Sequence, residues 1–478
     1  MKTLFKKQQP SAFTLPKGGV GGGLGFLLLI LLTLMGVGKS FACASTLPLG
    51  GDGGGLTLER VRQLALENEA SITIAERQMQ QQELQKKVAA TYHLPSISAM
   101  GGATYQANAL SEQMTAEVGI PAELGLPISS LQSNIPLNVS LNGAYLAGVQ
   151  LNQTIYAGGK VRSSNQMAEL GVAIASENKR MQEVNTIVEA DQAYWTFVAV
   201  QSKVQLAEKN VTLLETLVKR VGDSYEVGYT NQNDLLKVRV KHNQAKLDLK
   251  RAQNGLELCR MSLCRLIGFP LDTPIETDSI LYIDTELLVE LSGEDVSQRP
   301  EYQILEKQIQ LADTKIKHTR ADHLPQLAVT ANYGTWGGVE MNNMDLSNTG
   351  FSALAMLKVP LFNWGRGQKE IQMAELDKEM RTAELNKNSQ LMLLEISKAR
   401  FALEEAALTI SICTDNLAQA EENQRVSADS YELGKETISD LLVAQTQRQE
   451  AENELLEAKV NFKLAETEYL RTMGRVEN

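Results

Sequence analysis

The nearest approach to a chemical motif in this sequence is Gly158-Gly159-Lys160, which has the Gly-Lys step of a phosphate-binding loop. Such a loop also needs an earlier glycine, and a Ser or Thr after the lysine that binds magnesium. Thr154 and Val161 occupy those two positions here. The loop and the metal ligand are both missing, so the sequence excludes a nucleotide site of this kind.

The cysteines and histidines do not form a site either. Cys259, Cys264 and Cys413 include no CxxC pair and no Cys/His cluster, which argues against a zinc site or a disulfide framework. Three unpaired cysteines in helices are favoured, with a Cys259 to Cys264 bridge as the alternative. His93 and His323 occupy equivalent helix-to-strand junctions, which favours a structural role over metal binding. No hydrolase, metalloprotease or paired-carboxylate motif stands out, so we predict no enzyme, no cofactor and no metal.

The composition is that of an acidic chain with ordinary folding capacity. Its 478 residues include 46 Lys+Arg and 57 Asp+Glu, a net charge of −11, and 22% are charged. This composition argues against disorder. It also argues against nucleic acid as a partner, because phosphate binding needs concentrated positive charge. Only residues 20–38 are apolar for long enough to cross a bilayer as a helix, which excludes a polytopic helical membrane protein.

The N-terminus has the pattern of a secretory signal peptide. Lysines precede an apolar segment over 26–35, and Ala42-Cys43-Ala44 supplies a small-x-small site, so we expect cleavage after residue 44. Two alternatives stay open, which are a lipoprotein acylated at Cys43 and an uncleaved anchor. Removing residues 1–44 takes away five lysines, so 41 Lys+Arg against 57 Asp+Glu give −16 per chain and −48 for three chains.

The rest of the chain is a tandem repeat. A constant offset of 206 residues relates Ser224-Tyr225-Glu226-Val227-Gly228 to Ser430-Tyr431-Glu432-Leu433-Gly434. The same offset relates Asp234-Leu235-Leu236 to Asp440-Leu441-Leu442. Self-similarity on this scale indicates two copies of one structural unit.

Further upstream the offset grows. His93-Leu94-Pro95 returns as His323-Leu324-Pro325 at an offset of 230, so the first copy holds 24 extra residues within 96–155. We expect the stretch 108–138, with its three apolar-proline steps, to be an extracellular loop. The predicted organisation is a signal peptide over 1–44, a linker over 45–57, repeat 1 over 58–268, a linker or equatorial segment over 269–297, repeat 2 over 298–474 and a tail over 475–478.

Each copy has the same predicted order of helix, two strands and a long helical hairpin. Apolar residues at three- and four-residue steps predict the first helix, over 58–92 in one copy and 298–322 in the other. Long runs without proline predict the hairpin, which begins at Lys160 or Arg366 and turns at Gly228 or Gly434. Its second helix ends near residue 268 or 474. Such helices must pack laterally in a bundle, coiled coil or helical barrel.

Between these helices, a period of two predicts strands within 95–156 and 325–362. Apolar residues alternate over 97–105, 139–151, 327–333 and 351–361. Lengths of about 9 to 11 residues with one apolar face suit transmembrane strands, and strands of an ordinary sandwich are the alternative. Four strands cannot close a barrel and lipid does not tolerate an open sheet edge. Three copies give twelve strands, so we predict a homotrimer.

These features resemble the TolC-like outer-membrane efflux protein family. The resemblance rests on Val359-Pro360-Leu361-Phe362-Asn363-Trp364-Gly365-Arg366, on the paired Ser-Tyr-Glu-x-Gly turns and on the duplicated order of elements, and it covers residues 58–474. It implies a mixed α and β fold, in which a trimeric α-helical barrel crosses the periplasm and a shared twelve-stranded β-barrel spans the outer membrane. It also implies a passive duct for an efflux pump or type I secretion system, reached through a periplasmic adaptor and an inner-membrane transporter.

The resemblance further implies which residues meet the partners. The adaptor would contact the two helical corners, at Val227, Gly228, Tyr229 and Thr230 and at Leu433, Gly434, Lys435 and Glu436. The alternative is that both glycines only end helices. Asp440 matches an acidic ring at the pore entrance, and Asp234 is its counterpart in the first copy. The second ring position is Val443, and Glu436 replaces a latching arginine, so the latch of the family is in doubt. Asp234 and Asp440 are alternatively helix N-caps.

Two other classes of protein remain as alternatives. A periplasmic adaptor is also rich in helical hairpins, but it normally has one hairpin between two lipoyl-like half-motifs. This chain has two hairpins, each preceded by long alternating strands. A purely structural coiled-coil protein is disfavoured by the same strands. We therefore expect an outer-membrane channel subunit that extends into the periplasm.

Overall fold

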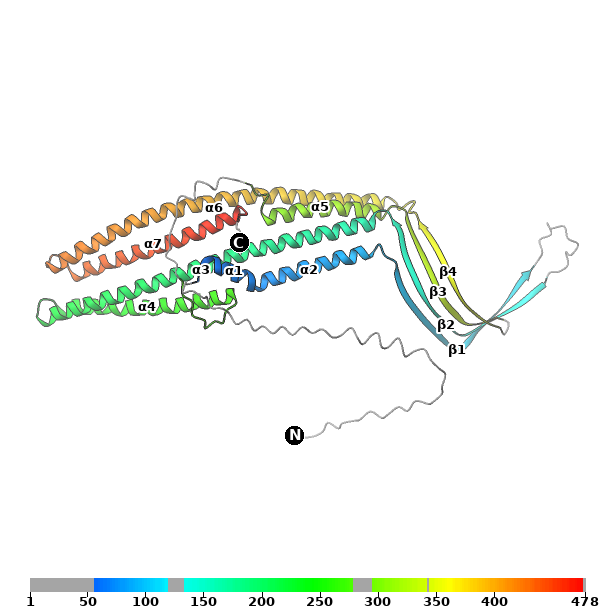
Figure 1. Cartoon of the computed structure of the whole chain (residues 1–478), viewed down its shortest axis with the longest axis horizontal. Coiled ribbons are helices and arrows are strands. Elements are labelled where there is room, and N and C mark those ends of the chain that lie inside the picture. Colours follow the sequence, from blue (N-terminus) through cyan, green and yellow to red (C-terminus); the bar gives the residue numbers. More distant parts are fainter. Residues whose placement is uncertain (1–55, 119–132, 278–294, 342–343, 476–478) are drawn as a thin grey trace, which may run out of the picture. The chain divides into compact units, whose positions relative to one another are not determined.

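The computed structural model describes residues 56–118, 133–277, 295–341 and 344–475 (Figure 1). They all belong to one compact unit, which begins at Gly54. The predicted signal peptide, the question of acylation at Cys43, most of the 45–57 linker and much of the 269–297 segment lie outside the described residues.

The first copy contains four helices, which are α1 (Leu58–Asn68), α2 (Ala70–Thr91), α3 (Lys160–Glu226) and α4 (Gln232–Ile267). The helical stretch predicted over 58–92 is present, but it is divided into two helices at residue 69. Glu69 has an extended backbone, with φ −68° and ψ 124°, and separates α1 from α2. α3 has 67 residues, which corresponds to a length of about 100 Å at 1.5 Å per residue.

The second copy contains α5 (Pro300–Ala321), α6 (Arg366–Glu432) and α7 (Ile438–Thr472). α6 has 67 residues, as many as α3, and it begins and ends 206 positions after α3. α2 and α5 both have 22 residues and follow the offset of 230. α4 lies along α3, α7 lies along α6, and α5 contacts both α3 and α6 (Figure 1).

One antiparallel sheet continues from the helices, and its strands are β1 (Ser96–Val118), β2 (Ser133–Ala157), β3 (Gln326–Met341) and β4 (Met344–Lys358). The strand order is β1-β2-β3-β4, so the pairing of β2 with β3 joins the two copies and β1 and β4 form the edges. The sheet begins where α2, α3, α5 and α6 end or start (Figure 1).

The prediction of a loop over 108–138 is wrong for most of that stretch. β1 and β2 stay paired as far as Val118 and Ser133, with one register shift between Tyr105 and Leu110. β1 and β2 have 23 and 25 residues against 16 and 15 in β3 and β4, so part of the extra length of the first copy lengthens its strands. β4, in contrast, ends at Lys358, before the predicted boundary at 361, because Pro360 has no N–H for a strand ladder.

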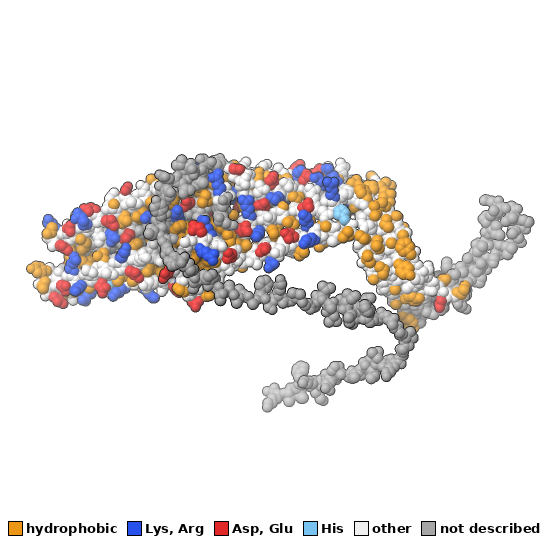
Figure 2. Space-filling view, viewed as in Figure 1, with side chains coloured by type: hydrophobic (Ala, Val, Ile, Leu, Met, Phe, Trp, Pro, Cys, Tyr) orange, Lys and Arg blue, Asp and Glu red, His pale blue; other side chains and the backbone are white. Residues whose placement is uncertain are grey.

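The two faces of the sheet differ in polarity. Val149, Tyr333 and Phe351 lie opposite one another on neighbouring strands and continue an apolar face. Figure 2 shows hydrophobic side chains gathered over the sheet, whereas charged side chains cover the helices. The other face carries a row of four directly paired polar residues, which are Ser98, Gln150, Asn332 and Ser352. Alternation of this kind matches the strands predicted from the sequence.

Buried residues form three clusters along the helices. The first surrounds Tyr194 and joins α1, α3 and α4, the second surrounds Val238 near the helical corners, and the third surrounds Phe462 between α6 and α7. Cys259, Cys264 and Cys413 are free. Across the described ranges, no helix combines the length and the apolar character needed to cross a membrane.

Candidate functional site

The corner between α3 and α4 is a helix C-cap built on glycine. Gly228 has φ 80°, a left-handed conformation that glycine adopts without a Cβ clash. The Tyr229 N–H donates to the Ser224 carbonyl at 2.8 Å, and the Gly228 N–H donates to the Tyr225 carbonyl at 3.0 Å. These two bonds define a Schellman motif, which satisfies carbonyls at the end of α3.

The corner between α6 and α7 repeats this geometry. Gly434 has φ 68°, and the N–H groups of Lys435 and Gly434 donate to the carbonyls of Ser430 and Tyr431 at 2.9 and 3.0 Å. A Cβ added to Gly228 or to Gly434 would meet no atom within 4 Å. Backbone conformation therefore favours glycine at both corners, and the space beside each glycine is open to a partner.

The corners expose apolar side chains to their surroundings. Tyr229 is 90% exposed, and Val227 and Leu433 are also exposed. Thr230 and Glu436, which occupy equivalent positions in the two copies, are instead half-buried. The Thr230 hydroxyl donates to Asp234 Oδ2 at 3.2 Å, and the Ser427 hydroxyl donates to Glu436 Oε2. Six of the eight residues predicted to dock the adaptor thus face outward, and these two do not.

Asp234 and Asp440 are not the N-caps of their helices. Asn231 caps α4 by accepting the Asp234 N–H at 2.9 Å, and Thr437 caps α7. Asp440 completes a capping box, because its Oδ2 accepts the Thr437 N–H at 3.0 Å and the Thr437 hydroxyl at 2.7 Å. The Thr437 hydroxyl and amide lower the pKa of Asp440, so this exposed carboxylate stays charged.

A lysine joins the two hairpins next to these acids. Lys237 Nζ donates to Ser439 Oγ at 2.9 Å, between α4 and α7, and lies 3.5 Å from Asp234 Oδ1. Arg220 of α3 also pairs with Glu432 of α6 at 2.8 Å. Glu432 of this ion pair is four residues before Glu436, the residue that stands where the family pattern has a latching arginine. The partners of the ion pair are 212 residues apart, so sequence spacing gave no signal for it.

A groove of about 650 Å³ runs between α4 and α7 just beyond the corners. Leu236, Val240 and Val443 line it and are exposed, while Lys237 and Glu450 line its polar parts. Val443 was singled out from the sequence, whereas Leu236 was named only as part of the repeat and Val240 was not named. Their four-residue spacing on one side of α4 is the signal that would have identified them.

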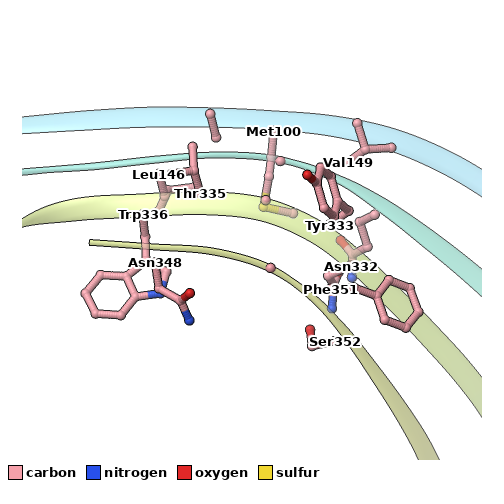
Figure 3. Close-up of a pocket in the computed structure, with 15 residues that line it drawn as sticks. Met100, Leu146, Val149, Asn332, Tyr333, Thr335, Trp336, Asn348, Phe351 and Ser352 are labelled. Carbon is pink, nitrogen blue, oxygen red and sulfur yellow. The ribbon is translucent and has the colours of Figure 1, made fainter. Parts of the chain in front are cut away.

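A second hollow, of about 340 Å³, lies on the sheet (Figure 3). Gly148 and Gly334 face each other there, and a Cβ on either would lie within 3.0 Å of the neighbouring strand. Trp336 and Asn348 lie side by side on one flank in Figure 3. In the described part of the chain, no cluster of His, Cys, Asp and Glu is arranged to hold a metal ion.

The sequence matches the family described as Outer membrane efflux protein over residues 61–268 and 292–475. The toluene efflux pump outer membrane protein TtgC of Pseudomonas putida is 21% identical, over 87% of this chain and 82% of its own. The probable outer membrane lipoprotein SilC of Salmonella typhimurium is 20% identical, over 67% of this chain and 69% of its own. CusC, described as forming a transmembrane channel, aligns with a TM-score of 0.71 at 15% identity and covers 89% of this chain and 95% of its own.

Proposed function

Because the chain belongs to the outer membrane efflux protein family, as its repeated motifs predicted, we propose that it is the outer-membrane channel subunit of a tripartite efflux pump or type I secretion system. It is a passive duct, anchored in the outer membrane and extending into the periplasm. Family membership disfavours the two alternatives, a periplasmic adaptor and a structural coiled-coil protein. We keep the proposed division into two repeats, over 58–268 and 298–474.

The observation that carries this proposal is the open four-stranded sheet. One face is apolar, and both edge strands, β1 and β4, lack a neighbour within the described sheet. An unpaired edge in lipid leaves backbone N–H and C=O groups without partners, which costs several kcal/mol per group. Three copies joined edge to edge close a twelve-stranded barrel, and the polar row through Gln150 and Asn332 then lines its interior.

The helices of the same three copies form the proposed α-helical barrel below the membrane. Their corners present Val227, Gly228 and Tyr229 from one hairpin and Leu433, Gly434 and Lys435 from the other to the hairpin of a periplasmic adaptor, which connects the duct to an inner-membrane transporter. Open space beside both glycines supports this docking, because an approaching backbone meets no Cβ. SilC is named as a probable lipoprotein, which supports testing the alternative in which Cys43 is acylated and becomes the first residue of the mature chain.

We further propose that Leu236, Val240 and Val443, the apolar side chains that line the groove, narrow the entrance of the duct. Asp440 is the proposed acidic element of the same entrance. Apolar constrictions close pores by excluding water. Val443→Asp should therefore raise single-channel conductance, whereas Val426→Asp, an exposed position on α6, should leave it unchanged.

The proposal is tested by purifying the full chain from outer membranes and adding it to planar lipid bilayers. A trimer that resists mild SDS without heating and conducts ions in stepwise increments is the expected result. Monomeric protein in the soluble periplasmic fraction, with no conductance, would contradict it.

A further inference from the structure

The two copies meet inside the chain along a seam between α3 and α5. Lys160 Nζ lies 2.5 Å from Asp322 Oδ1, and Ser163 Oγ lies 3.1 Å from His318 Nδ1. Thr314, one turn earlier on the same side of α5, is buried. At these positions the intrachain seam makes specific polar contacts.

The internal repeat relates the α5 residues of this seam to equivalent positions on α2. With the offset of 230, the α5 residues Thr314, His318 and Asp322 correspond to Leu84, Val88 and Tyr92. All three of these apolar residues are exposed, although α2 covers its opposite side on α3. The face of α5 that meets α3 thus has an apolar counterpart on α2 with nothing against it among the described residues.

The repeat likewise relates the α3 residues of the seam to equivalent positions on α6. Met167, Leu170 and Ile174 of α3 are half-buried. With the offset of 206 they correspond to Met373, Leu376 and Met380 of α6, which are 69%, 56% and 62% exposed. Exposed apolar residues at helical spacing on both α2 and α6 are complementary surfaces.

We propose that Leu84, Val88 and Tyr92 on α2 of one copy pack against Met373, Leu376 and Met380 on α6 of a second copy of this chain. This interchain seam rests on the proposed channel and specifies how its subunits meet. The strands give the same pairing, because β1 follows α2 and β4 leads into α6. Joining β4 of one copy to β1 of the next therefore brings these two helices together.

The interchain seam differs in chemistry from the intrachain seam. The positions of the Lys160–Asp322 ion pair are taken by Arg366 and Tyr92, and a guanidinium over a tyrosine ring is attractive. Val88 and Leu84 replace His318 and Thr314, so the α2 side is apolar, while Lys369 replaces Ser163 on α6. Permanent subunit interfaces are more hydrophobic than the surface of a protein that acts alone, which fits an obligate assembly.

An outlier in the backbone lies at the membrane end of this seam. Trp364 has φ 50°, the only positive φ of a non-glycine residue among those described, and it corresponds to Gly158, with φ 62°. Gly158 lies against Leu324, whose counterpart is Leu94. Trp364 is 90% exposed, and its ring contacts Phe362 at 5.0 Å. Strain of this kind persists where other contacts compensate it, and Leu94 of a neighbouring copy supplies such contacts.

The seam is tested by crosslinking the full chain with a reducible bifunctional thiol reagent. Val88→Cys with Lys369→Cys, the counterparts of His318 and Ser163, should give covalent trimers in place of monomers on denaturing gels. Val88→Cys with Lys378→Cys is the matched control, because Lys378 faces Asp313 of its own chain at 2.7 Å. It should give no interchain product, and neither should each single variant.

The native mass of the same samples separates the two proposals. Trimers that form but do not crosslink through Val88 and Lys369 overturn the seam and leave the channel in place. Absence of trimers in every sample overturns the channel itself. Crosslinking of the Lys378 control as strongly as the test pair would also overturn the seam. Ser163→Cys with His318→Cys should crosslink within one chain, which calibrates the reach of the reagent.

Discussion

The two copies have the same corners, and their long helices α3 and α6 have the same length. They differ in the contacts that hold α3 and α6 to other helices halfway along. In the first copy, Asp191 of α3 is fully buried. It accepts two hydrogen bonds from Arg62 of α1, both at 2.6 Å, and one from Thr467 of α7 at 2.7 Å. The counterpart of Asp191 in the second copy is Ser397, so the triad occurs once.

The copies do share one ion pair at this level. Arg265 pairs with Glu189 at 2.9 Å in the first copy, and Arg471 pairs with Glu395 at 2.5 Å in the second. The first pair is more than half exposed, whereas Arg471 is largely buried and Glu395 also binds Arg299 at 2.8 Å. The two copies are thus alike at the corners, where we propose that partners dock, and differ in the contacts made halfway along α3 and α6.

The largest expected effect is the loss of the buried acid. Asp191→Asn leaves the Arg62 guanidinium without its counter-charge, and breaking a buried pair in this way costs about 3 kcal/mol. The thermal unfolding midpoint of the helices, followed by circular dichroism, should fall sharply. Ser397→Ala, the matched change in the second copy, should have little effect. Equal shifts of the unfolding midpoint for both variants would contradict a special role for Asp191 in the first copy.

The shared ion pair should respond differently in the two copies. Glu395→Gln removes the charge that pairs with two arginines and should lower the free energy of unfolding by about 1 kcal/mol, whereas Glu189→Gln, at an exposed pair, should lower it by a few tenths of a kcal/mol. The same thermal measurement compares them. A larger loss of stability for Glu189→Gln would contradict the claim that the Arg471–Glu395 pair stabilises the fold more than the Arg265–Glu189 pair does.

The contribution of Glu395 to stability should also depend on pH. Burial raises its pKa, but the hydrogen bonds from Arg299 and Arg471 outweigh burial and hold the pKa below the ordinary value. A lowered pKa stabilises the fold above the unfolded value of about 4.3, and this contribution is lost as the pH falls through the folded pKa. The gap in unfolding midpoint between the wild-type chain and Glu395→Gln should therefore close below that pH. A constant gap would contradict the role of the charge.

The corners should behave as equals. Alanine at Gly228 or Gly434 must adopt a positive φ but meets no clash, so each change costs about 1 kcal/mol. Unfolding of each single variant and of the double variant measures this cost. A difference of more than twofold between the single variants would show that one corner carries a contact that the other lacks.

The smallest effects are expected at the caps. Asn231→Ala and Thr437→Ala each remove a side-chain bond to a helix N-terminus, which costs about 1 kcal/mol or less. Thr437→Ala should be the larger change because it also breaks the capping box with Asp440. Gln232→Ala, an exposed position at the start of α4, is the control. A larger effect at Asn231 than at Thr437 would contradict the role of the box.

Local patterns in the sequence predicted the repeated elements well. The offset of 206 anticipated the equal lengths of α3 and α6, and the glycines marked both corners because a left-handed residue favours glycine. The break at Glu69 has no Gly or Pro to signal it. The strand residues within 108–118 and 133–138 were missed because prolines suggested a loop, whereas pairing between strands includes Pro136. The Arg62–Asp191–Thr467 triad joins residues far apart in sequence, so only the folded chain brings it together.

The central claim is that three copies of the open sheet close one barrel. Native mass spectrometry of the full-length protein, released from outer membranes into detergent, tests it most directly. The predicted result is a single assembly of three times the mass of the mature chain. A monomer, or an assembly with another number of chains, would contradict the twelve-stranded closure.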